Sequence, residues 1–209
     1  MMLNKAQHTM TRTVLHLKLL VFLIAAFFLN PRSTLAFSND GGNMPSFADF
    51  SRSVQNGEAE TLRGVYVTKV LALPVIQQPH DLPYYVSNRD GQVTQFSMAS
   101  QYGNTGLLAH NNLSGRFFSQ LSMGHRVRLV YGDGRVEHFV VTNILRFQAT
   151  EPESISSSFR NLDRNETIAA HELFNRAYGA ERHLVFQTCI KAEGNPSWGR
   201  LFIIAVPVE

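Results

Sequence analysis

HLVFQTCIKAEGNPSWGRLFII, residues 183–204, is the stretch that decides the fold, because it holds two apolar runs around one turn. The runs are rich in Leu, Val, Ile and Phe, and the Gly-Asn-Pro sequence at 194–196 favours a turn, so the stretch predicts an antiparallel hairpin. Cys189, the one cysteine of the chain, lies near the end of the first run, and Arg200 opens the second. The hairpin therefore brings a thiol and a guanidinium to the same end of two strands.

The two faces of the first predicted strand differ in polarity. Side chains alternate along a strand, so Val185, Gln187 and Cys189 share one face, whereas the even-numbered residues 184–190 form a mostly apolar face. We expect the apolar face to pack in the core, so that Cys189 and Gln187 point toward a groove. A buried cysteine that packs as a small hydrophobic side chain is the alternative.

The position of Arg200 suggests a chemical role for the pair. Neighbouring strands lie about 4.8 Å apart, so Arg200 can reach the neighbourhood of Cys189. A guanidinium there would stabilise the oxyanion that develops on a carbonyl attacked by the thiol. A solvated cation at a strand end is the other interpretation.

Short strand-like runs continue through most of residues 61–209. They are LRGVYVTKVLAL, PYYVSN, GQVTQFSMA, GLLAH, HRVRLVY and VEHFVVTNILRF, and an Asp-Gly pair at 133–134 marks a hairpin between the last two. Helical periodicity occurs only at 114–121 and at 166–179, where Gly179 is a plausible C-cap. The pattern predicts a mainly β fold, a closed or nearly closed β-barrel with one or two short helices.

The first 60 residues predict export and a linker. Residues 1–36 have a basic start, an apolar run at 19–29 and a Thr-Leu-Ala end, which is typical of a signal peptide. An uncleaved N-terminal anchor is the alternative. Residues 37–60 are polar and rich in Gly, Ser and Asn, so we interpret them as a linker or arm before a single domain over 61–209.

The charge balance argues against nucleic acid as a partner. The leader holds four Lys and Arg and no acid, so removing it from 19 basic and 16 acidic residues leaves 15 against 16, a balance of −1. The basic character of the whole chain thus comes from the leader, and no basic stripe follows it. Contact with a membrane is expected only through the N-terminal segment, if that segment is retained. The lone cysteine can form no internal disulfide.

A thiol nucleophile needs an acid/base partner, and histidine is the usual one. Six histidines follow the leader. His110 ends the Gly-containing run GNTGLLAH at a predicted strand end before a loop, which makes it the candidate. The absence of any catalytic histidine stays open. The other five occupy positions typical of the surface: His80, His125, His138, His171 and His183.

Four segments together resemble the sortases, cysteine transpeptidases of bacterial cell envelopes. They are LLAHNN, FFSQLSMGHRVRLVYGDGRVEHFVVTNI, LVFQTC and GRLFIIA, and the resemblance covers about residues 62–209. The family has a His at a strand end, an F-x-x-L-x-x-G-x-x-V segment, a Thr-Cys pair ending a strand and an Arg opening the next. These fall on His110, on 118–127, on Thr188 with Cys189, and on Arg200. Departures, such as Ala109 where Gly is usual and LVFQTC before the loop, leave the subclass unassigned.

The resemblance implies a sortase-like barrel and a transpeptidation reaction. Cys189 would attack the carbonyl of a threonine-containing sorting signal and form a thioacyl-enzyme. His110 would protonate the departing amine and later deprotonate the incoming one, while Arg200 steadies the oxyanion and Thr188 helps to orient the substrate. The implied partners are the sorting-signal peptide of a secreted protein and an amine acceptor. No metal or other cofactor is implied, and the implied location is the extracellular face of the cytoplasmic membrane or the medium.

Three alternatives belong to other classes. An L,D-transpeptidase also uses Cys, His and Arg, but its compact SHGC-x-R motif is absent. Papain-like and peptidoglycan-cleaving peptidases normally place Cys before His, whereas every histidine of this chain precedes Cys189. A non-catalytic barrel of sortase ancestry, acting as a binding or assembly module, predicts an unreactive thiol.

Overall fold

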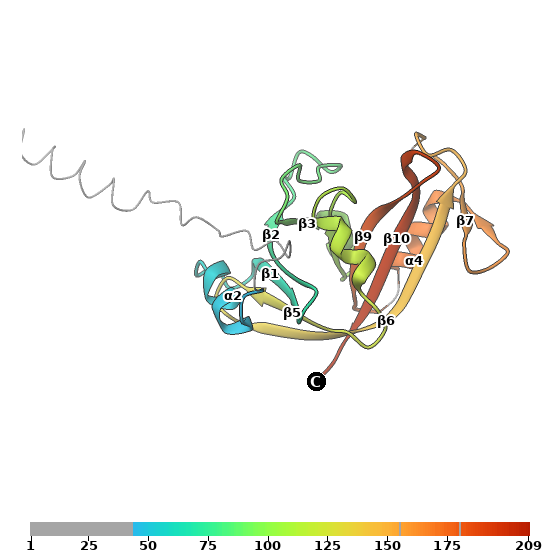
Figure 1. Ribbon diagram of the computed structural model, residues 1–209. Coiled ribbons are helices and arrows are strands. Elements are labelled where there is room, and N and C mark those ends of the chain that lie inside the picture. Colours follow the sequence, from blue (N-terminus) through green and yellow to red (C-terminus); the bar gives the residue numbers. More distant parts are fainter. Residues whose placement is uncertain (1–43, 155, 180) are drawn as a thin grey trace, which may run out of the picture. The chain divides into compact units, whose positions relative to one another are not determined.

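The structure, a computed structural model, describes residues 44–154, 156–179 and 181–209 (Figure 1). The predicted signal peptide over 1–36 and the start of the predicted linker, 37–43, lie outside the described residues. None of the helices in the described part of the chain combines the length and the apolar character needed to cross a membrane.

The strands of the described residues form one sheet. Its order is β10-β9-β4-β3-β2-β1-β5-β6-β7-β8, and an additional pairing of β10 with β6 closes the first eight into a barrel. β2 with β3 and β4 with β9 are the parallel pairs. The mainly β, closed-barrel prediction is therefore confirmed. The bounds are β1 Leu62–Val67, β2 Leu71–Gln77, β3 Val93–Phe96, β4 Thr105–Leu108, β5 Arg126–Tyr131, β6 Val136–Ala149, β7 Phe159–Asn161, β8 Thr167–Ile168, β9 Leu184–Ala192 and β10 Asn195–Pro207.

Apolar side chains from the barrel strands fill its interior, and the 3₁₀-helix η1 (Ser114–Gln120) contributes to that core. Alternate residues face inward, so Leu184 and Phe186 of β9 lie in the core, as the strand pattern predicted. Phe118 of η1 packs edge to face on Phe186, with ring centroids 5.1 Å apart. Each such side chain contributes roughly 1.5–3 kcal/mol by leaving water.

A second apolar cluster lies on the outer face of β9, β10 and β6, under helix α4 (Ala170–Tyr178). Leu173 and Tyr178 of α4 pack there with Val185 of β9 and Phe202 of β10. The helix begins later than the predicted 166–179, because Thr167 and Ile168 pair with β7 as the short strand β8. It ends at Gly179, the predicted C-cap, whose N–H donates to Asn175 O at 2.7 Å.

The linker interpretation of 37–60 is wrong for the part that forms helix α2 (Phe47–Val54). Ser46 caps this helix through a hydrogen bond from Asp49 N–H to its hydroxyl. Phe50 is 1% exposed and lies one turn from the buried Val54, so both sit on one helix face and pack against the sheet. The segment is polar in composition, but these two side chains are enough to bind it to the barrel.

Two further local predictions differ from the structure. Residues PYYVSN, predicted as a strand, form a loop, because the Gln78 side-chain amide donates to Pro83 O and Tyr85 O at 2.9 Å each and curls the chain. Helix α3 (Ser97–Gln101) follows β3 directly, where the sequence predicted a longer strand. With α2 and α3, the described residues hold four short helices rather than one or two.

Candidate active site

β9 and β10 run side by side (Figure 1), and Cys189 and Arg200 lie directly opposite each other in this antiparallel pair. Residues opposite in such a pair have their Cβ atoms about 4.5–5.5 Å apart and their side chains on the same face. The turn that joins the strands is tighter than predicted, because only Glu193 and Gly194 lie between the paired residues Ala192 and Asn195. Glu193 and Gly194 both have a positive φ, as a two-residue hairpin turn requires. Cys189 is half-buried, on the face of β9 opposite the barrel core.

His110 reaches the same level from the other side of β9. β4 runs parallel to β9, and its last residue, Leu108, lies opposite Gln187. Two residues further on in each segment, His110 stands level with Cys189. Two hydrogen bonds maintain this alignment past the end of β4: Ala109 N–H donates to Gln187 O at 3.3 Å, and the Thr188 hydroxyl donates to Ala109 O at 2.8 Å. His110, two residues past the end of β4, thus forms a row with Cys189 of β9 and Arg200 of β10.

The backbone of His110 is anchored while its imidazole is not. Its carbonyl accepts hydrogen bonds from Leu113 N–H and Gly115 N–H, both at 3.0 Å, which close the turn into η1. The side chain is half-buried, and it makes no hydrogen bond to any residue that the structure describes. The ring therefore keeps both nitrogens for a reacting group.

The guanidinium of Arg200 is held on its own hairpin. Its Nη1 donates to Ser197 O and Gly199 O, both at 2.9 Å, and its central carbon lies 6.0 Å from the Phe159 ring centroid. Arginine carries five N–H donors, so the three on Nη2 and Nε stay unused by the described residues. Those donors are the ones that could reach an oxyanion at Cys189.

Thr188 does not join the row. Its side chain is 5% exposed, lies on the face of β9 opposite Cys189 and donates its hydroxyl proton to the Ala109 carbonyl. A Cβ atom at Gly115 would lie 2.4 Å from the Thr188 hydroxyl oxygen, so only glycine fits there. The surroundings of Thr188 therefore suit a residue that aligns the His110 loop. Thr188 also lines the same pocket as Cys189, and its role in orienting the substrate stays a prediction.

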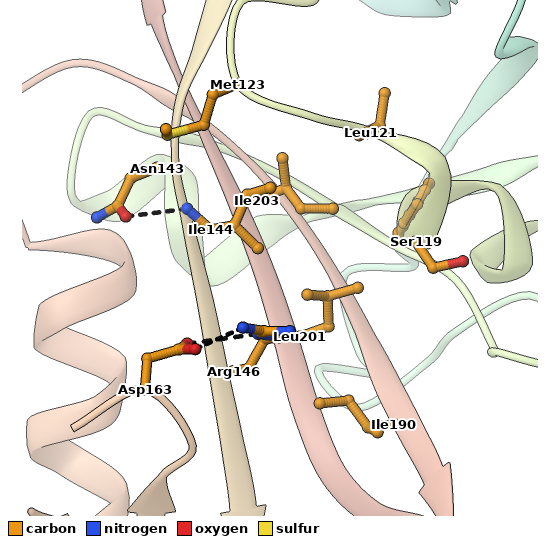
Figure 2. Close-up of a pocket in the computed structure, with 11 residues that line it drawn as sticks. Ser119, Leu121, Met123, Asn143, Ile144, Arg146, Asp163, Ile190, Leu201 and Ile203 are labelled. Carbon is orange, nitrogen blue, oxygen red and sulfur yellow. Dashed lines mark hydrogen bonds and ion pairs between the residues drawn. The ribbon is translucent and has the colours of Figure 1, made fainter. Parts of the chain in front are cut away.

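Two pockets lie beside the hairpin. The smaller, about 410 Å³, is lined by Cys189 with Thr188 and Ile190 and by the 111–119 segment. The larger, about 590 Å³, shares Ser119, Ile190 and Leu201 with it and continues along η1 and β6. Figure 2 shows Ile190, Leu201 and Ile203 between Ser119 and the Arg146–Asp163 ion pair in the larger pocket.

The segment that walls the smaller pocket is fixed by an ion pair. Arg116 of η1 donates to Asp90 at 2.7 Å, and this hydrogen bond holds the pKa of the Asp90 carboxyl below its usual value. Ser114 also donates to Asp90, at 3.3 Å, and accepts from Gln92 N–H at 3.1 Å. Within the described residues, no cluster of three or more His, Cys, Asp or Glu side chains could hold a metal ion.

The remaining histidines lie outside the row. His80, His138 and His171 are exposed and His125 is half-buried beside Ser122, so the predicted surface positions hold for the exposed three. The prediction is wrong for His183, which is 3% exposed. Its ring nitrogens lie 2.8 Å from Ala177 O and 2.6 Å from Glu181 O, so it closes the C-terminal end of α4.

Tyr178 is a neighbour of the site that its sequence position did not reveal. The sequence pattern placed it within the predicted helix 166–179, and its ring packs in the outer cluster. Its hydroxyl, however, donates to Gln187 Oε1 at 2.7 Å, next to Cys189 on the same face of β9. The one available signal was the hydroxyl itself, since a buried tyrosine usually finds a polar partner.

No family model and no curated protein sequence matches the chain. Similar solved structures include three sortases. Sortase C1 of Streptococcus agalactiae, in a complex with MTSET, is 14% identical, with 76% of this chain and 73% of that chain covered and a TM-score of 0.44. Sortase A of Listeria monocytogenes is 13% identical (74% and 89%, TM-score 0.44), and sortase C of Clostridium perfringens is 13% identical (78% and 82%, TM-score 0.42). These values are too low to assign a reaction to the chain.

Proposed function

We propose that the chain is a sortase-like cysteine transpeptidase, which cleaves a sorting-signal peptide through a thioacyl-enzyme and transfers the acyl group to an amine. The observation that carries the proposal is the row made by Cys189 on β9, Arg200 opposite it on β10 and His110 just past the end of β4. The order of these residues in the sequence, together with the motifs around them, supports the same reaction. A half-buried thiol that lines a pocket is also better suited to chemistry than a core cysteine.

In the first half-reaction the thiolate of Cys189 attacks the peptide carbonyl, and a C–S bond forms. The carbonyl electrons move to oxygen, where the free N–H groups of Arg200 stabilise the charge. His110, as imidazolium, gives its proton to the peptide nitrogen. The C–N bond then breaks, the amine leaves, and the acyl group stays on sulfur as a thioester.

In the second half-reaction an amine replaces the sulfur. His110, now neutral, accepts the proton that the incoming amine loses as it attacks the thioester carbonyl. Arg200 stabilises the second oxyanion, the C–S bond breaks, and Cys189 leaves as a thiolate beside the imidazolium. Across the two half-reactions the bonds formed and broken and the protons transferred balance without a metal or an oxidant. The proposed setting is the outer side of the cell envelope, where an exported chain meets secreted proteins and an amine acceptor.

The test is mass spectrometry of the full chain after brief treatment with a thiol-directed alkylator across pH. Wild type is compared with His110→Ala and Arg200→Ala. Fast labelling of wild type, with a rate or pH profile that changes in both variants, is the expected result. A thiol that reacts only after denaturation would overturn the proposal and favour the non-catalytic binding or assembly module.

A further inference from the structure

Gln187 is a polar side chain between two apolar ones on the neighbouring strands, and it lies next to Cys189. It precedes Cys189 by two residues on the same face of β9, and its partners across the neighbouring strands are Leu108 of β4 and Phe202 of β10. Both partners are buried. An amide placed among apolar groups costs free energy unless its donors and acceptors are satisfied, so the position calls for a hydrogen-bonding role.

Tyr178 fixes the orientation of the Gln187 amide. The tyrosine is 1% exposed, with its ring centroid 5.6 Å from Phe96 and 5.1 Å from Phe174. Its hydroxyl donates to Gln187 Oε1 at 2.7 Å. Burial raises the pKa of Tyr178, so the hydroxyl stays protonated and remains a donor. With Oε1 held in this way, the Gln187 NH₂ group is turned away from Tyr178.

The NH₂ group of Gln187 has two N–H donors and makes no hydrogen bond to any described residue. The side chain is half-buried, which leaves it open to a ligand. A donor in such a site is best satisfied by an oxygen atom of a bound molecule. A carboxylate or amide oxygen suits it, whereas a cationic or apolar group would leave it unpaired.

The distance between Gln187 and Cys189 along β9 indicates which residue of a bound peptide would contact Gln187. Two residues of a strand span roughly 7 Å, and two residues of an extended peptide span the same length. The end of the strand beyond Cys189 is open, because Lys191, Glu193 and Gly194 are exposed. The departing and incoming amines need that open side, so the acyl part of the peptide runs toward Gln187.

Resting on the transpeptidase function proposed above, we infer that Gln187 is a specificity-determining residue. Its NH₂ group, oriented by Tyr178, donates to the side chain about two residues before the attacked carbonyl. The preferred acyl donors are therefore peptides that carry a side-chain carboxylate or amide oxygen at that position. The sequence resemblance does not supply this preference, because its motif residues fall on Thr188 and Cys189 and not on Gln187.

The experiment is a peptide array in which each position before the cleaved bond is varied, with acyl transfer to a simple primary amine as the readout. Wild type should prefer Asp, Glu, Asn or Gln two residues before the attacked carbonyl, by about tenfold in kcat/KM over Leu. Gln187→Leu should lose that preference. Gln187→Glu still accepts from Tyr178 but offers no donor, so it should shift the preference toward Lys and Arg.

Tyr178→Phe is the matched variant, because it keeps the aromatic packing and removes only the hydroxyl that orients the amide. It should weaken the preference by an intermediate factor. A wild-type enzyme that transfers acyl groups but shows the same preference as Gln187→Leu and Gln187→Glu would overturn the inference about Gln187 alone. A wild-type chain that forms no acyl-enzyme with any peptide, and whose thiol is inert to alkylation, would overturn the proposed function instead.

Discussion

The hydroxyl of Thr188 donates a hydrogen bond to the carbonyl of Ala109, at 2.8 Å, and so joins the residue before Cys189 to the residue before His110. The two lie 79 positions apart in the sequence. β4 has ended one residue before Ala109, so no regular ladder holds His110 in line with Cys189. The Thr188 hydrogen bond continues the alignment by one more step.

Thr188→Val should therefore lower both activity and stability. The substitution keeps the shape of the side chain but leaves the Ala109 carbonyl without its donor, at about 1–3 kcal/mol in the free energy of unfolding. We expect kcat for acyl transfer to fall by about tenfold or more, because a misplaced His110 delivers its proton poorly. Thr167→Val, at an exposed position of β8, is the control and should change neither quantity. Equal kcat values in wild type and Thr188→Val would show that the His110 loop is aligned without this hydrogen bond.

Arg200→Lys tests whether a planar fork is needed beside Cys189. A lysine that held both Ser197 O and Gly199 O would have one N–H left, where arginine has three. Its ammonium group also does not match the fixed geometry of the fork. The loss of one oxyanion donor typically costs about 10²–10³ in kcat, and we expect a decrease of that order. Single-turnover acyl-enzyme formation is the measurement, with Arg126→Lys at an exposed position of β5 as the control. Wild-type rates in Arg200→Lys would remove Arg200 from the mechanism.

Cys189→Ala separates catalysis from folding. The thiol is half-buried and lies outside the barrel core, so its removal should leave the melting temperature within a few degrees of wild type. Acyl-enzyme formation, followed by intact mass, should disappear. Peptide cleavage that continued in the variant would mean that another nucleophile does the chemistry.

The parts of the site that were predictable are those that are local in sequence. Cys189 and Arg200 belong to one hairpin, and strand alternation with the spacing of paired strands brings them together. His110 depends on a parallel pairing with a distant strand, which no local pattern encodes, so its sequence position made it only a candidate and the sortase resemblance supplied its role. The Tyr178–Gln187 hydrogen bond could not be foreseen, because the packing of α4 on the sheet decides where that hydroxyl points.

The fold shows the same division. The β character and the hairpins followed from alternation and turn residues, whereas α2 was missed because it is short and lies in a segment rich in Gly, Ser and Asn. Its packing depends on tertiary contacts, among them those of Phe50, Val54 and Phe47. Likewise, the surface assignment of His183 failed because neighbouring charged residues say nothing about carbonyl oxygens at the end of α4.

Phe50→Ala tests whether α2 belongs to the folded domain. The ring is buried against Tyr66, with centroids 5.6 Å apart, and a Cβ atom at Gly64 would lie 2.9 Å from it. Truncation of a buried phenylalanine typically costs about 3–5 kcal/mol. We expect a loss in that range in urea denaturation, and little change for Arg52→Ala, which removes only an exposed ion pair with Asp49. A stability equal to wild type would restore the linker interpretation for this segment.

Asp90→Asn tests the ion pair that fixes η1 beside the smaller pocket. The hydrogen bond from Arg116 lowers the pKa of Asp90 in the folded chain, so the pair stabilises the fold above the unfolded pKa of about 3.9. That contribution is lost as the pH falls through the lower, folded-state pKa. The pair is partly exposed, so solvent screening keeps its contribution within about 1 kcal/mol.

Melting temperatures of wild type and Asp90→Asn should therefore differ at neutral pH and converge in strong acid. Asp81→Asn, at an exposed loop position, serves as the control. A difference between wild type and Asp90→Asn that grew as the pH fell would contradict this account, because the sign of the linkage would then be reversed.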